Sequence, residues 1–150
     1  MNKLILLICS LVCLGILGCD PNGSTVVAPE GSTIILDPDT FTININAAMP
    51  VTTHDYFINV EVRDVNGNPK PLQELFFWCG VACDLGYVYL TDNHGNVIDT
   101  NVGDVHGVTD VNGNYYLWVH YVGGGGNTYT QTIRATSGMA DAYHELNVGS

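Results

Sequence analysis

Two cysteines, Cys79 and Cys83, are the residues of this chain whose type and spacing most directly suggest chemistry. Three residues separate them, whereas redox-active and zinc-binding pairs usually have two residues between the cysteines. In an exported protein such a pair forms a disulfide by default. The loop that a Cys79–Cys83 bond closes is small, and its closure entropy is modest. We therefore expect a structural disulfide that mainly shapes the end of a strand. The alternative is a redox-active or metal-binding pair.

Three short segments, residues 64–68, 92–96 and 110–114, follow the pattern Asp-x-Asn/His-Gly-Asn and offer side-chain oxygens at alternate positions. Calcium loops use carboxylate and amide oxygens in this way, but here glycine is at the fourth position and no glutamate completes an EF-hand. Because Asn-Gly pairs are also typical of hairpin turns, we predict three turns and no metal or other cofactor. The weak calcium candidates are Asp64, Asn66, Asp92, Asp110 and Asn112.

Tyr116, Trp118 and His120 form a candidate ligand-binding surface. Successive side chains of a strand point to opposite faces, so these three lie on the outer face if Leu117 faces the core. Exposed aromatic groups mark contact surfaces, and carbohydrate is one ligand that they would suit. The alternative is that residues 79–104 cover them.

The sequence does not indicate an enzyme. The five histidines lie on different segments, and His144 shares a face with Leu146 and Val148, which predicts a core or edge position. No Ser-His-Asp order is present, and the acids include no pair that the sequence singles out. The glycine run at residues 123–126 lacks the lysine and the helix that phosphate binding requires.

The chain is strongly acidic, with 4 Lys plus Arg against 15 Asp plus Glu and a net charge of −11. Residues 1–18 contain Lys3 and no acid, so their removal leaves 3 basic and 15 acidic residues and a net charge of −12. Such a surface repels phosphate backbones and anionic lipid headgroups. Nucleic acid is therefore excluded as an expected partner.

Residues 1–18 have the pattern of an export signal. Lys3 provides a basic start, and the apolar run at residues 4–17 is shorter than the roughly 20 residues of a membrane span. The end of the run, Ile16-Leu17-Gly18-Cys19, resembles the lipobox of bacterial lipoproteins. The resemblance implies cleavage before Cys19, which would then carry diacylglyceryl and N-acyl chains, and two or more such chains anchor a protein stably.

This resemblance implies a lipid-anchored protein of the cell envelope, exposed to the periplasm or the exterior. We expect the outer membrane, although Asp20 resembles an inner-membrane retention signal of enteric bacteria. Residues 19–31 are rich in Asp, Pro, Asn, Gly, Ser and Thr and predict a flexible tether.

From residue 32 to 150 every segment has the pattern of a strand or a turn. In residues 56–63, Tyr56, Ile58 and Val60 alternate with more polar residues, as in a half-buried strand. No segment shows a sustained helical period. Several short strands separated by turn residues predict an all-β sandwich. The other expected strands are residues 33–36, 41–47, 74–78, 86–91, 97–98, 115–122, 129–136 and 140–148.

The order of these segments is similar to that of bacterial immunoglobulin-like domains of the invasin and intimin type, also called Big domains. The matching pieces are residues 62–71, 76–78, 109–114 and 133–138. The resemblance covers residues 32–148 and implies an immunoglobulin-like sandwich of seven or eight strands. It also implies a structural, interaction or adhesion module at a cell surface, with a protein or glycan partner. Two departures are the presence of one domain only and an insertion at residues 79–104.

The leading hypothesis is therefore a surface lipoprotein that presents one interaction module. The alternatives are a carbohydrate- or ligand-binding module and an accessory subunit of a larger surface assembly.

Overall fold

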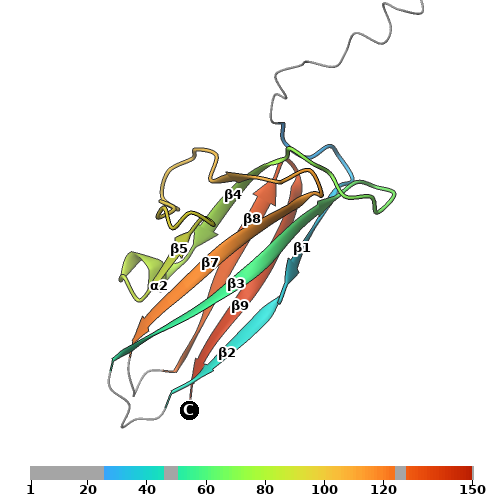
Figure 1. The fold of residues 1–150 in the computed structure, drawn as a ribbon. Coiled ribbons are helices and arrows are strands. Elements are labelled where there is room, and N and C mark those ends of the chain that lie inside the picture. Colours follow the sequence, from blue (N-terminus) through green and yellow to red (C-terminus); the bar gives the residue numbers. More distant parts are fainter. Residues whose placement is uncertain (1–25, 46–50, 124–127, 150) are drawn as a thin grey trace, which may run out of the picture.

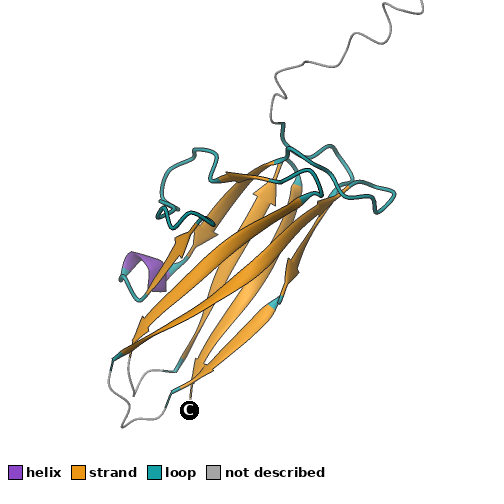
Figure 2. Ribbon diagram, viewed as in Figure 1, coloured by secondary structure: helices purple, strands orange, loops and turns teal. Residues whose placement is uncertain are grey.

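The computed structural model describes residues 26–45, 51–123 and 128–149, which form two β-sheets packed face to face (Figures 1 and 2). The predicted signal peptide, Cys19 and Asp20 lie outside the described residues, as do Ala47 and most of the glycine run. In the described ranges no helix is long and apolar enough to cross a bilayer.

The first sheet has four antiparallel strands in the order β1-β3-β7-β5. β3 and β7 are its long central strands, and their pairing runs from Thr52 opposite Gly123 to Glu61 opposite Asn114. The four strands are β1 (Thr33–Asp37), β3 (Thr52–Arg63), β7 (Asn114–Gly123) and β5 (Val88–Thr91).

The second sheet has five strands in the order β2-β9-β8-β4-β6. All pairs are antiparallel except β2 with β9, which run parallel. The chain leaves the first sheet after Asp37 and enters the second at Thr40, so β1 and β2 are successive but belong to different sheets. The five strands are β2 (Thr40–Asn44), β9 (Ala140–Gly149), β8 (Tyr129–Ser137), β4 (Glu74–Cys79) and β6 (Gly107–Val108).

This strand order is that of an immunoglobulin fold. β1, β3, β7 and β5 occupy the places of strands A, B, E and D, and β4, β8 and β9 those of C, F and G. The predicted all-β, immunoglobulin-like sandwich is therefore confirmed. The described residues contain nine strands rather than seven or eight, because β2 and the two-residue β6 add to the basic seven.

The core lies between the sheets, where the predicted alternation holds. Ile58, Val60 and Val62 of β3 are fully buried, and the outward residues between them are more exposed. Leu117 and Val119 of β7 are buried beside them. The predicted core position of His144 is confirmed, since its side chain is fully buried. The second sheet contributes Leu75, Phe77, Ile133, Leu146 and Val148.

Residues 26–31, which the sequence placed in the tether, lie against the domain instead. The backbone of Val26 accepts a hydrogen bond from the Glu74 N–H (2.9 Å) and donates one to the Leu72 carbonyl (3.1 Å). Ala28 is buried, and its N–H donates to Ser137 Oγ at 2.9 Å. The folded domain therefore includes these residues, which sequence composition alone did not indicate.

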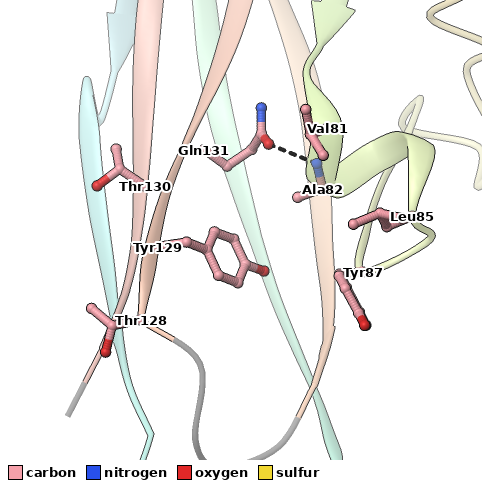
Figure 3. A pocket seen from close by; sticks show the side chains of 8 residues that line it. All are labelled: Val81, Ala82, Leu85, Tyr87, Thr128, Tyr129, Thr130 and Gln131. Atoms are coloured by element: carbon pink, nitrogen blue, oxygen red, sulfur yellow. Dashed lines mark hydrogen bonds between the residues drawn. The ribbon is translucent and has the colours of Figure 1, made fainter.

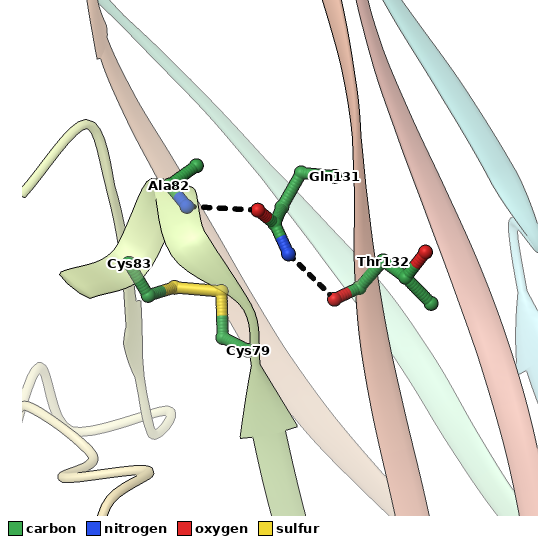
Figure 4. Close-up of a disulfide and its surroundings, with 5 residues drawn as sticks. All are labelled: Cys79, Ala82, Cys83, Gln131 and Thr132. Carbon is green, nitrogen blue, oxygen red and sulfur yellow. Dashed lines mark hydrogen bonds between the residues drawn. A yellow bond between two sulfur atoms is a disulfide. The ribbon is translucent and has the colours of Figure 1, made fainter. Parts of the chain in front are cut away.

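One short helix, α2 (Val81–Asp84), follows β4 and was not predicted, because four residues are too few to show a helical period. A disulfide joins Cys79, the last residue of β4, to Cys83 in α2, with their Cα atoms 5.7 Å apart (Figure 4). The bond folds α2 back against the end of the strand.

Candidate interaction surface

Three aromatic side chains lie together on the outer face of the first sheet, and we call Phe57, Tyr116 and Trp118 the aromatic patch. Trp118 is directly opposite Phe57 in the β3–β7 register. The ring centroids of Phe57 and Trp118 are 5.6 Å apart, and those of Phe57 and Tyr116 are 6.0 Å apart. The exposed fractions are 47% for Phe57, 44% for Tyr116 and 36% for Trp118.

The structure places Tyr116 and Trp118 on the outer face, as their strand alternation predicts. The alternative explanation, that residues 79–104 cover these side chains, is wrong for Tyr116 and Trp118, which keep a large exposed fraction. It holds for His120, which Tyr89 and Thr91 of that segment contact. Sequence reasoning missed Phe57 as a member of the patch. The alternation of β3 puts Phe57 outside, but only the strand pairing shows that it faces Trp118.

His120, the third predicted residue, lies on the same face but in a separate group of side chains. Its Nδ1 is 2.8 Å from Asp55 Oδ1, and its Nε2 is 3.0 Å from Thr91 Oγ1. The ring of Tyr89 stacks on His120 with centroids 4.5 Å apart.

An Asp–His–hydroxyl chain has the order of a hydrolytic triad. Here the hydroxyl belongs to Thr91, which is only 5% exposed, so it is not presented to a substrate. The contacts instead hold the His120 ring under Tyr89. These contacts therefore fix the positions of His120 and Tyr89 beside the aromatic patch.

A shallow groove of about 600 Å³ borders the aromatic patch. Phe57 and Trp118 line it together with two carboxylates, Asp37 and Asp55. Phe41 lies in its wall and stacks on Tyr56, with ring centroids 4.0 Å apart. The groove thus combines an apolar surface with negative charge.

The three aspartates among the calcium candidates accept hydrogen bonds from their own turns. Asp64 Oδ1 accepts hydrogen bonds from the N–H groups of Asn66 (2.8 Å) and Asn68 (2.9 Å). The bond from Asn68 helps to hold the pKa of Asp64 below its usual value. Asp92 Oδ1 accepts the corresponding hydrogen bonds from the N–H groups of His94 and Asn96. Asp110 Oδ1 accepts them from the N–H groups of Asn112 and Asn114.

One oxygen of each aspartate therefore closes a turn, which is the role that the turn interpretation gives it. Among the described residues no three His, Cys, Asp or Glu side chains are grouped to hold a metal ion.

The outer face of the second sheet carries a different set of rings. The Arg134 guanidinium lies 5.6 Å from the ring centroid of Trp78 and 5.7 Å from that of Tyr143. Asp141 pairs with Arg134 at 3.2 Å and accepts a hydrogen bond from the Tyr143 hydroxyl at 3.0 Å. The side chains of this group thus bind one another. Sequence reasoning missed the group, since it depends on the registers of three strands.

No family model matches the chain, and no curated protein matches it. Similar solved structures include domains 4 and 5 of the S-layer protein SbsC, with a TM-score of 0.48, 14% identity, and coverage of 79% of this chain and 51% of that chain. A structure of SbsC domains 1–6 has a TM-score of 0.48 and 13% identity, covering 79% of this chain and 13% of that chain. An ASH/PapD-like domain of human CEP192 has a TM-score of 0.43 and 12% identity, covering 83% of this chain and 89% of that chain.

The chain spans about half the length of the first of these structures. Because every TM-score is below 0.5, these similarities carry no argument about function. The assignment of the immunoglobulin-like topology rests on the strand order itself.

Proposed function

We propose that this chain is a lipid-anchored protein of the cell envelope whose sandwich is a non-enzymatic interaction module. The module binds a protein partner, as an accessory subunit of a surface assembly would, through the aromatic patch. The observation that carries the proposal is the exposure of three adjoining aromatic rings on one sheet face. Tyr, Trp and Phe are enriched in the buried centres of protein interfaces, and Tyr and Trp among the residues that dominate binding energy.

The chemistry of the groove supports a partner of a particular kind. Asp37 and Asp55 lie beside Phe57 and Trp118, in a chain of strong net negative charge. An apolar partner surface with a basic rim is complementary to this arrangement.

A protein suits the patch better than a glycan does. The Phe57 ring is inclined by 53° to that of Trp118 and by 69° to that of Tyr116. The three rings therefore do not form the flat platform on which sugar rings stack.

Two features support the anchored arrangement. The sequence Ile16-Leu17-Gly18-Cys19 supports lipidation at Cys19. Val26, where the described chain begins, is bound at the start of β4, at the end of the sandwich that carries the β8–β9 turn (Figure 1). An anchor attached from this end leaves the outer faces of both sheets free for a partner.

Site-specific photo-crosslinking on intact cells tests this function. Phe57 is replaced by p-benzoylphenylalanine in one strain, and in the control strain the same replacement is made at Tyr143, an exposed aromatic residue of the opposite sheet. We expect one discrete protein adduct from position 57 and none of that mass from position 143. The additional substitution Trp118→Ala should reduce the adduct at least tenfold, since it removes the neighbouring ring.

Adducts of equal yield from both positions, or no adduct from position 57, would contradict the proposal. Binding of a saccharide that is lost in Trp118→Ala would assign the patch to a glycan ligand instead.

A further inference from the structure

A concave region separate from the aromatic patch lies between α2 and the first residues of β8 (Figure 3). Its volume is about 520 Å³, within the range of about 300 to 1,000 Å³ that is usual for small-ligand sites. Tyr129 and Gln131 of β8 line one side, and Ala82, Leu85 and Tyr87 line the other. We call this region the α2 pocket.

Two interactions fix the wall that α2 provides. The Cys79–Cys83 disulfide ties the helix to the end of β4. The Ala82 N–H donates to Gln131 Oε1 at 2.9 Å, and Gln131 Nε2 in turn donates to the Thr132 carbonyl at 2.8 Å (Figure 4). The pocket is therefore preorganised, which lowers the entropic cost of binding a ligand.

The described residues that line the α2 pocket include no Asp, Glu, Lys, Arg or His, although the chain carries 15 acids. Apolar side chains are exposed at its edge, where Val81 is 68% exposed and Leu85 is 63% exposed. Polar groups lie beside them, namely the hydroxyls of Tyr87 and Tyr129 and the amide of Gln131.

We propose that the α2 pocket binds an uncharged saccharide. A pyranose ring has an apolar C–H face, which suits Leu85 and the tyrosine rings, and a hydroxyl edge, which suits the phenol and amide groups. The Gln131 amide is bonded at both ends, to Ala82 and Thr132, and so fixes this wall of the pocket. The Tyr129 hydroxyl has no hydrogen-bond partner in the described structure, so a saccharide hydroxyl would supply one. An aliphatic ligand would leave the Tyr129 hydroxyl without a partner, and an unpartnered buried polar group costs about 1–3 kcal/mol.

The test is an array of neutral and charged mono- to tetrasaccharides probed with the full-length protein in lauryldimethylamine oxide, a detergent without a sugar headgroup. We expect the protein to bind at least one neutral saccharide. Tyr87→Ala and Leu85→Ala should each weaken this binding at least tenfold without lowering the melting temperature, because both side chains are exposed. Tyr143→Ala, an exposed aromatic residue of β9, is the matched control and should leave the affinity unchanged. Trp118→Ala is measured beside it to detect binding at the aromatic patch instead.

Chemical shifts locate the site independently. Titration with the saccharide should move the Ala82 backbone amide and the Gln131 side-chain amide in NMR spectra, and leave those of Phe57 and Trp118 in place. Three results would overturn the proposal: no neutral saccharide binds, only charged glycans bind, or binding is lost in Trp118→Ala and kept in Tyr87→Ala. None of them depends on the photo-crosslinking of position 57, so this proposal and the interaction module can fail separately.

Discussion

His144 is buried in the core, and its two hydrogen bonds fix the position of its proton. Its Nδ1 lies 2.9 Å from the Pro38 carbonyl, which can only accept, so Nδ1 carries the hydrogen. Nε2 is then the acceptor for the Tyr56 hydroxyl at 2.8 Å. Burial lowers the pKa of His144, because the charged imidazolium is poorly solvated there.

Because His144 is buried in its neutral form, we expect the folded protein to lose stability in mild acid. The pKa of histidine in the unfolded chain is about 6.5, and in the folded state it is lower. Between these two pKa values the unfolded state binds more protons than the folded state. The stabilisation that neutral His144 provides is therefore complete above about pH 6.5 and is lost as the pH falls below it. We expect the free energy of unfolding to fall between pH 7.5 and pH 5.5, measured by urea denaturation.

The variant His144→Gln should be less stable at pH 7.5 and should show a smaller decrease between the two pH values. His94→Gln, at an exposed turn, is the control and should keep the wild-type decrease. An equal decrease in His144→Gln would show that other groups cause the acid sensitivity.

Residue roles that depend on neighbours in the sequence were predictable, and those that depend on strand register were not. The period of two placed His144 inside and Trp118 outside, and the Asp-x-Asn-Gly-Asn pattern predicted the turns. The contacts of His120 join residues that are 29 and 65 positions away in the sequence. Such contacts require the pairing of β3, β5 and β7, which composition and periodicity do not give.

The secondary-structure elements show the same contrast between what depends on the local sequence and what depends on strand pairing. Both segments that became β1 and β2 were predicted as strands, but their membership of different sheets depends on tertiary pairing. The strands at the sheet edges are short, with five residues in β1 and β2, four in β5 and two in β6. Short edge strands limit pairing with other chains, so the outer faces rather than the edges are available for binding.

A disulfide ties helix α2 to the end of β4, and this gives a prediction at the scale of the element. The bond joins residues four positions apart, so a chain-entropy estimate gives about 2 kcal/mol of stabilisation. Replacing Cys79 and Cys83 together by serine should therefore lower the free energy of unfolding by about 2 kcal/mol.

The local effect of the double replacement should be larger than the global one. The Tyr87 amide, which donates to the Ala82 carbonyl, should exchange its hydrogen faster, whereas the Val60 amide in β3 should change only with global stability. Equal protection of Tyr87 in the two proteins would show that hydrogen bonds, among them the one from Ala82 to Gln131, hold α2 without the disulfide.

In the whole molecule the proposed binding regions are separate and chemically different. The aromatic patch lies on the outer face of the first sheet beside two carboxylates, and the α2 pocket is uncharged. Val26 pairs with Gln73 just before β4, and α2 follows the other end of that six-residue strand. At about 3.3 Å per residue, the α2 pocket lies roughly 20 Å along the strand from the point where the chain enters the domain.

The proposed lipidation at Cys19 would set which end of the molecule faces the membrane, and it is tested by metabolic labelling with radioactive palmitate. The wild-type protein should be labelled and should sediment with membranes, because two or three acyl chains anchor stably. Cys19→Ala should lose the label, whereas Cys13→Ala, a cysteine within the apolar run, should keep it. Cys19 belongs to the predicted tether, so any Cys19→Ala protein that is recovered should melt at the wild-type temperature. Equal labelling of Cys19→Ala would show that the chain is not anchored through this residue, and the orientation of both binding regions would then be set by something other than a lipid at Cys19.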